Sequence, residues 1–198
     1  MKYVPARVGA KEAQAFFRRR RWGNLFGLLW REQPAAIKKT PESRSVLPRI
    51  EKIWIPHYQI DFRVTARSGP GTVSVSVEAC SGCFAIFQMH DALVEGALGD
   101  DYLPALIEEQ EAVQQGRRQL LQAIMRRRGQ QGKPVIEEAL GATLFYYPFW
   151  LYYFRRRGKF IDIRLLDAFS AERGGSRTRQ GILNAFVAQR GTATSRLS

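Results

Sequence analysis

Two stretches of the chain, residues 53–82 and residues 145–171, repeat one pattern of apolar runs. Each stretch contains two apolar runs separated by a glycine-containing turn, which is the pattern of a β-hairpin with a buried face. The second run of each leads to an acidic residue, Ala, a variable residue and Ser, at Glu78–Ser81 and at Asp167–Ser170. Matched residues at matched spacing indicate an internal repeat, so the sequence predicts two related antiparallel β-units.

A proline occupies the same place in both stretches, Pro56 in the first and Pro148 in the second. Proline cannot donate a hydrogen bond to a sheet, so its recurrence predicts a bend in each unit. Residues 83–87 form a further apolar run that predicts a third strand in the first unit. The other predicted strands are Ile53–Val64, Thr72–Ala79, Leu144–Arg156 and Lys159–Leu166.

Helical periodicity marks the segments around the two units. Between the units, Leu106, Val113 and Leu120 repeat every seven residues and predict one long amphipathic helix over residues 103–128. Shorter apolar patterns, several of them bounded by glycine or proline, predict the other helices. These cover residues 10–22, 25–32, 134–140 and 181–189.

The predicted fold class is therefore α+β: two related antiparallel β-hairpin or three-strand units, with flanking helices and one long helix between them. The chain divides by composition into five segments. They are a basic helical segment and linker (1–46), a first β-unit with an acidic loop (47–102), the long helix (103–132), a second β-unit with a C-terminal helix (133–190), and a disordered tail (191–198).

Charge is distributed unevenly over the 198 residues. The formal net charge is +13, and 31 Lys or Arg residues outnumber 18 Asp or Glu residues. Residues 1–40 carry a net charge of +8, whereas residues 89–112 hold seven carboxylates and no Lys or Arg. Such asymmetry is typical of proteins that meet an anionic partner such as nucleic acid or a membrane surface. An arginine-rich but merely solvated surface would give the same counts.

Arginine clusters are the candidate anion-binding residues. Arginine offers a planar fork of donors that matches a phosphate group, and clustered arginines favour nucleic acid or another polyanion. The candidates are Arg18, Arg19, Arg20 and Arg21; Arg126, Arg127 and Arg128; Arg155, Arg156 and Arg157; and Arg177 and Arg179.

Aromatic residues crowd the segment 145–154, immediately before the arginines at 155–157. Aromatic faces beside guanidinium groups suit single-stranded nucleic acid, because bases stack and phosphates pair. They equally suit a membrane interface. The competing interpretation is a strand that buries both of its faces, and the strand pattern of the first unit favours it. Tyr147, Phe149 and Tyr153 would be the residues left for binding.

Two cysteines and two histidines form the weak candidate metal site: Cys80, Cys83, His57 and His90. Two thiolates with two imidazoles match the tetrahedral preference of zinc. The repeat argues against this site, because Phe149 and Phe169 take the positions of His57 and Cys80 in the second unit. Inert packing is therefore favoured over zinc and over redox chemistry, and no cofactor is expected.

Catalytic motifs are absent from the sequence. There is no Gly-x-Ser-x-Gly, no His-Glu-x-x-His and no complete phosphate-binding loop. The longest uncharged stretch, Ala139–Phe154, is shorter than the ~20 residues of a membrane-spanning helix, so no transmembrane segment is expected. No signal peptide is recognisable and two cysteines make no disulfide framework, which predicts a cytoplasmic protein.

The sequence thus predicts a non-enzymatic binding or adaptor protein with a basic face that contacts nucleic acid or another polyanion. The alternative is a protein–protein or self-associating adaptor that uses the apolar helices 25–30 and 103–128. A zinc-stabilised module is the third hypothesis.

Overall fold

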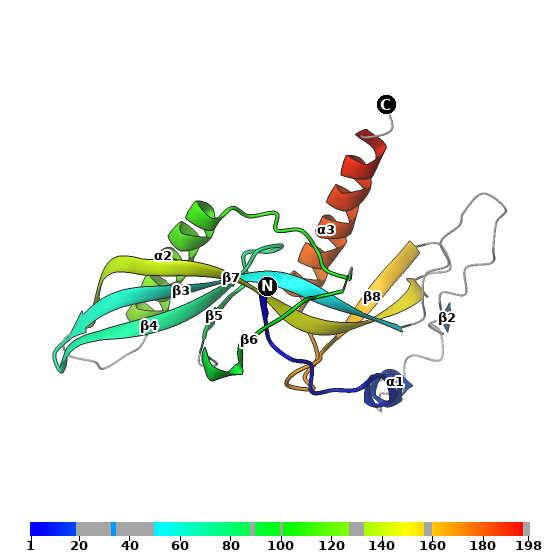
Figure 1. The fold of residues 1–198 in the computed structure, drawn as a ribbon, viewed down its shortest axis with the longest axis horizontal. Coiled ribbons are helices and arrows are strands. Elements are labelled where there is room, and N and C mark those ends of the chain that lie inside the picture. The colour runs from blue at the N-terminus through cyan, green and yellow to red at the C-terminus, as the bar shows by residue number, and fades with distance from the viewer. Residues whose placement is uncertain are drawn as a thin grey trace. The chain divides into compact units, whose positions relative to one another are not determined.

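The computed structural model describes residues 1–18, 33–34, 50–87, 90–99, 101–126, 133–156 and 160–195. Over these ranges the chain has a mixed α/β fold, one eight-stranded sheet with three α-helices (Figure 1). The helices are α1 (Ala10–Arg18), α2 (Glu109–Arg126) and α3 (Ser176–Ser195), with a short 3₁₀ turn, η2 (His90–Ala92).

The sheet has the strand order β5-β4-β3-β7-β1-β6, and β2 and β8 also pair with β7. The pairings of β3 with β4 and of β7 with β8 are antiparallel, whereas β1 runs parallel to β7. The strands are β1 (Lys2–Tyr3), β2 (Gln33–Pro34), β3 (Ile50–Ala66), β4 (Gly69–Glu78), β5 (Phe84–Ile86), β6 (Val94–Glu95), β7 (Val135–Arg156) and β8 (Phe160–Asp167).

The chain forms two compact units, and the long strands β3 and β7 contribute to both. Unit 1 comprises Met1–Pro5, Trp54–Tyr147 and Ser176–Ser198. Unit 2 comprises Ala6–Ile53 and Pro148–Gly175.

The first hairpin, β3–β4, belongs to unit 1 and confirms the predicted strand pair. Its register runs from His57 opposite Glu78 to Ala66 opposite Gly69, with a two-residue turn between the strands. A turn near residues 68–70 would place His57 almost opposite Ser81, but the two-residue turn pairs His57 with Glu78. The tighter turn shifts the register, and Gly69 accommodates it with a φ of +113° that other residues rarely adopt.

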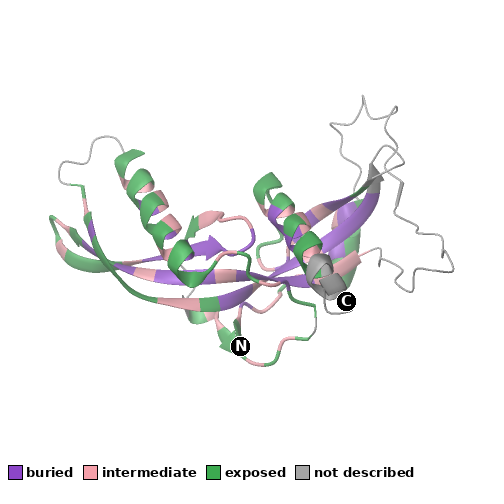
Figure 2. Ribbon diagram, turned by 90° about the horizontal axis from the view of Figure 1, so that it is seen from above, coloured by how far each residue is buried: buried purple, intermediate pink, exposed green. Residues whose placement is uncertain are grey.

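The core of unit 1 lies between this hairpin and α2. Helix α2 turns its buried residues to the sheet and exposes the other side (Figure 2). Gly116 permits this close approach, since an added Cβ would lie 3.1 Å from Cδ1 of Ile60. The core includes Tyr58, Ile60, Phe62, Val64, Val75, Val77 and Ala79 from the hairpin, and Ala112 and Leu120 from α2.

The second hairpin, β7–β8, belongs to unit 2 and packs against α1. Its register runs from Phe149 opposite Asp167 to Arg156 opposite Phe160. The ring of Phe17 on α1 stacks on Tyr152, with centroids 5.4 Å apart. The remaining core residues of this cluster are Ala13, Phe154 and Leu166.

Three predicted helices differ from the structure. Residues 134–140 are not helical, because β7 already begins at Val135, where Ile136 joins the core of unit 1 and Glu138 pairs with Arg63 at 2.6 Å. Helix α2 is shorter than predicted, since residues 103–107 run beside the first hairpin. Helix α3 is longer and continues to Ser195, into the segment predicted as a disordered tail. The predicted helix 25–32 lies outside the described residues.

Candidate functional site

The described arginines of the predicted clusters fall into both units. Arg18 is exposed at the end of α1 in unit 2, and Arg155 and Arg156 end strand β7 in the same unit. Arg126 is exposed at the end of α2 and Arg177 in the first turn of α3, with Arg179 half-buried beside it, all in unit 1. The other predicted members, Arg19–Arg21, Arg127, Arg128 and Arg157, lie outside the described residues.

The chain segments of the two units differ sharply in charge. Those of unit 2 contain 18 Lys or Arg against seven Asp or Glu, a net charge of +11. Those of unit 1 contain 13 against 11, a net charge of +2. Most of the excess positive charge of the protein therefore belongs to one compact unit, which focuses the attraction for an anion.

Two further arginines of unit 2 lie over aromatic rings. The guanidinium carbon of Arg7 is 3.9 Å from the ring centroid of Phe169, and that of Arg164 is 5.4 Å from Phe154. Arg7 is exposed and Arg164 is half-buried, so the first of these contacts holds a cation at the surface, just beyond the end of β8. Neither arginine belongs to a run of basic residues, so neither was among the candidates predicted from the sequence.

The aromatic segment before Arg155 is mostly interior. Phe149, Tyr152, Tyr153 and Phe154 are each no more than 9% exposed. The hydroxyl of Tyr153 donates to Oε2 of Glu51 at 2.6 Å, and burial, followed by this bond, raises the pKa of Tyr153. Of the three rings proposed for binding, Phe149 and Tyr153 are therefore unavailable for base stacking. Tyr147 is half-buried.

The cysteine–histidine group forms no metal site in the described part of the chain. Cys80 is buried, its thiol donates to the carbonyl of Pro104 at 3.6 Å, and burial raises its pKa to about 12. His57 Nδ1 lies 3.0 Å from Ser76 Oγ, and its ring packs against Phe145. Among the described residues no group of three or more His, Cys, Asp or Glu side chains is placed to hold a metal ion. The side chain of His90 lies outside that description.

Glu78, which pairs with His57 across the hairpin, is a buried acid that the sequence did not single out. It is 2% exposed, and within the described residues its Oε1 atom has no hydrogen-bond partner. Burial raises its pKa, while hydrogen bonds from Ser81 and Thr178 act in the opposite direction. Glu78 lies beside helix α3, where an added Cβ at Gly181 would be 3.0 Å from Oε1 of Glu78 and 2.7 Å from Cβ of Ser81.

Within the described ranges, no helix combines the length and the apolar composition that crossing a membrane requires. No protein family, curated protein or solved structure matches the chain.

Proposed function

We propose that the protein binds nucleic acid through unit 2, by contacts between basic side chains and phosphate groups, without catalysing a reaction. The concentration of positive charge in unit 2 carries this proposal. Polyanion binding needs several cations within one compact unit, because each phosphate contact releases a counterion and adds to the affinity.

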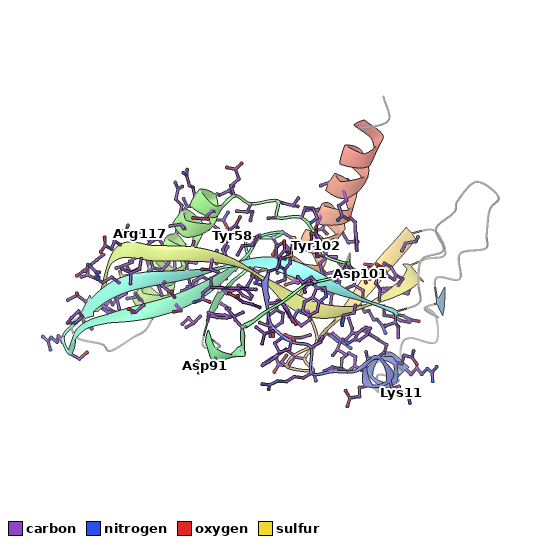
Figure 3. All side chains as sticks on the ribbon, viewed as in Figure 1. Lys11, Tyr58, Asp91, Asp101, Tyr102 and Arg117 are labelled. Carbon is purple, nitrogen blue, oxygen red and sulfur yellow. The ribbon has the colours of Figure 1, made fainter. Side chains whose placement is uncertain are left out.

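Separate features of unit 2 support the same conclusion. Exposed Lys11 and Arg18 lie on α1, and Arg7 and Arg164 lie over aromatic rings of the hairpin on which α1 packs. Figure 3 labels Lys11 on the outer side of α1. The candidates Arg126, Arg177 and Arg179 of unit 1 remain predictions of additional contacts. Both described cysteines are free, which is consistent with a cytoplasmic setting.

Salt-dependent binding tests the proposal. The nuclease-treated full-length protein is titrated with labelled DNA and RNA at several salt concentrations. Substituting Arg18, Arg155 and Arg156 by Gln should weaken binding at least tenfold and lower the slope of log K against log salt by about 0.9 per lost contact. The matched control substitutes Lys2, Arg67 and Arg118 by Gln, three exposed residues of unit 1, and should leave both quantities near their native values.

Equal losses in the two triple variants would show that only the overall charge matters and would refute a site in unit 2. A native protein that binds no more tightly than a charge-matched unrelated protein would refute nucleic-acid binding as a whole. Binding to anionic lipid vesicles or heparin alone would assign the surface to another polyanion.

Protein–protein interaction is the second candidate, and one observation favours it. Leu121 and Met125 lie one turn apart on α2 and are 50% and 58% exposed. The rest of the apolar stripe of α2 is used in the core of unit 1, so this surface is small. A molecular mass that rises with concentration, and that Leu121→Gln with Met125→Gln abolishes, would favour the adaptor hypothesis.

We also propose that the two hairpins, β3–β4 and β7–β8, are copies of one repeated sequence, as the sequence pattern predicts. Support comes from their registers, because Pro56 and Pro148 each directly precede a residue paired with an acid, Glu78 or Asp167. The next residue in each hairpin, Ala79 or Ala168, donates its amide to the carbonyl of that proline, at 2.8 Å and 3.1 Å.

A further inference from the structure

A second pair of matched segments lies outside the hairpins. Residues 3–8 read Tyr-Val-Pro-Ala-Arg-Val, and residues 102–107 read Tyr-Leu-Pro-Ala-Leu-Ile. The match continues into the helices that follow, where Glu12, Ala13 and Arg18 recur 99 positions later as Glu111, Ala112 and Arg117. The labelled residues Tyr102 and Arg117 mark the second of these segments in Figure 3.

The two segments begin with the same backbone contact to a long strand. The amide of Val4 donates to the carbonyl of Tyr146 on β7 at 2.9 Å. The amide of Leu103 donates to the carbonyl of Trp54 on β3 at 2.9 Å. Tyr146 and Trp54 each stand two residues before the proline of their hairpin, so the acceptors are equivalent.

Both segments then converge on the equivalent alanine of a hairpin. Two consecutive amides, at residues 7 and 8, donate to the carbonyl of Ala168 at 2.8 Å each. Two consecutive amides, at residues 106 and 107, donate to the carbonyl of Ala79 at 2.9 Å and 3.0 Å. The same arrangement, one carbonyl that accepts two successive amides, therefore occurs at both alanines.

The helices complete the correspondence through their core residues. Ala13 of α1 and Ala112 of α2 are both fully buried against their hairpins. Phe17, which contacts Tyr152, corresponds to Gly116, which contacts Ile60. The core positions Tyr58, Ile60, Phe62 and Val77 of the first hairpin recur as Trp150, Tyr152, Phe154 and Leu166 in the second.

The tyrosines that open the segments make matched ring contacts. Tyr3 lies edge-on to Trp54 with ring centroids 5.2 Å apart, and Tyr102 lies edge-on to Tyr146 at 5.6 Å. Tyr3 pairs through its backbone with the second hairpin's strand while its ring contacts the first hairpin's strand. Tyr102 does the reverse.

We infer that the chain is a tandem duplication whose two copies have exchanged a segment. Each copy runs Tyr-x-Pro-Ala segment, helix and hairpin. The first copy's segment, residues 2–18, docks on the hairpin of the second copy, and the second copy's segment, residues 101–126, docks on the hairpin of the first. Each hairpin is thus a docking surface for a Tyr-x-Pro-Ala-x-aliphatic segment followed by a helix.

The exchange explains why neither copy is complete alone. A hairpin without its partner segment leaves the carbonyl of its alanine unpaired and its apolar face open to water. The partner that fits each surface is therefore the other copy of the same unit. This inference extends the hairpin repeat proposed above and is independent of nucleic-acid binding.

A reciprocal replacement in the full-length chain tests whether the two dockings are equivalent. Val4→Leu, Arg7→Leu and Val8→Ile convert the first segment into the second, and Leu103→Val, Leu106→Arg and Ile107→Val do the converse. The exchanged chain keeps the native composition and net charge. We expect one cooperative unfolding transition with a midpoint no more than about 10 °C below the native value, because the contact of Arg7 with Phe169 is lost and the buried positions 4 and 103 exchange a Val for a Leu.

A control chain carries residues 3–8 and 102–107 in reversed order, again with native composition and charge. It should lose the cooperative transition, and hydrogen exchange should show no protection of the amides at positions 7, 8, 106 and 107. In the exchanged chain these four amides should stay protected. The inference is overturned if the exchanged and reversed chains behave alike, whether both fold or neither does.

Discussion

At the scale of single residues, His57 and Glu78 are two titratable side chains that pair across the first hairpin and take part in no proposed function. Burial lowers the pKa of His57 to about 3, so its imidazole is neutral at pH 7. In the second hairpin, Phe149 and Asp167 occupy the same register. Asp167 accepts hydrogen bonds from the amides of Phe169 and Ser170, whereas Glu78 is satisfied only in part.

Glu78 should make the stability of the protein depend on pH. Its folded-state pKa lies above the ordinary value of 4.5, so the folded state holds the proton more tightly. Its stabilising contribution is complete below pH 4.5 and is lost as the pH rises through the folded-state pKa. Glu78→Gln removes this titration, so the free energy of unfolding of the variant should gain on the native protein as the pH rises.

Urea unfolding at intervals from pH 4 to pH 8 measures this difference, which grows by about 1.4 kcal/mol for each unit by which the pKa is raised. Glu95→Gln, on exposed strand β6, is the control and should follow the native curve. A gap between Glu78→Gln and the native protein that does not change with pH would contradict the assignment.

At the scale of elements, the close approach of helices to the first hairpin explains glycine positions that helix propensity alone does not predict. Glycine disfavours a helix interior, yet Gly116 sits in the middle of α2, where an added Cβ would lie only 3.1 Å from Cδ1 of Ile60. The same logic places Gly181 in α3 beside the turn at Ser81. Residues 135–140 form part of strand β7 although the sequence predicts a short helix there, because Ile136 joins the core of unit 1.

The prediction at this scale is that substitutions at Gly116 and Ile60 change the free energy of unfolding in a non-additive way. Gly116→Ala should lower the free energy of unfolding by about 1 kcal/mol, since the clash with the fully buried Ile60 outweighs the gain in helix propensity. Ile60→Val removes the clashing Cδ1 atom. The double variant should therefore be more stable than the sum of the single effects by about 1 kcal/mol.

Urea unfolding of the four proteins gives this coupling energy. Gly116→Ala combined with Ile55→Val, a substitution at another fully buried β3 position, is the control and should be additive. Additive effects for Gly116 and Ile60 would show that the helix shifts to accommodate the methyl group.

At the scale of the whole molecule, the two compact units carry very different charge. The segments of unit 1 are almost balanced, and those of unit 2 carry +11. The rings before Arg155 are buried in the strand rather than presented to bases. In the proposed function, contacts to phosphate therefore dominate and stacking contributes little.

Single-stranded and double-stranded nucleic acids should consequently bind with similar affinity when they present the same number of phosphates. We expect dissociation constants within about threefold at equal salt, because base stacking, at ~1–3 kcal/mol per base, is not available from the buried rings. Fluorescence anisotropy with matched oligonucleotides measures the ratio. A tenfold or larger preference for single strands would show that half-buried Tyr147 or residues outside the described ranges supply a stacking surface.

The hydrophobic pattern by itself determined the two hairpins, the third strand at residues 84–86 and the existence of a long helix. Alternation of period two and the spacing of apolar residues act locally, so they can be found without a fold. The same pattern predicted the matched hairpins, and the arginine runs identified the candidate anion-binding residues.

Only the tertiary structure decided how these elements combine. The register of β3–β4 depends on a two-residue turn, and the strand at residues 135–140 depends on a core that is assembled from distant segments. Residues 3–8 match residues 102–107 in the sequence alone. Only the structure shows that the first segment donates its amides to Ala168 and the second to Ala79, one in each hairpin. Long-range pairing has no local signature, because its energy resides in contacts between residues far apart in the chain.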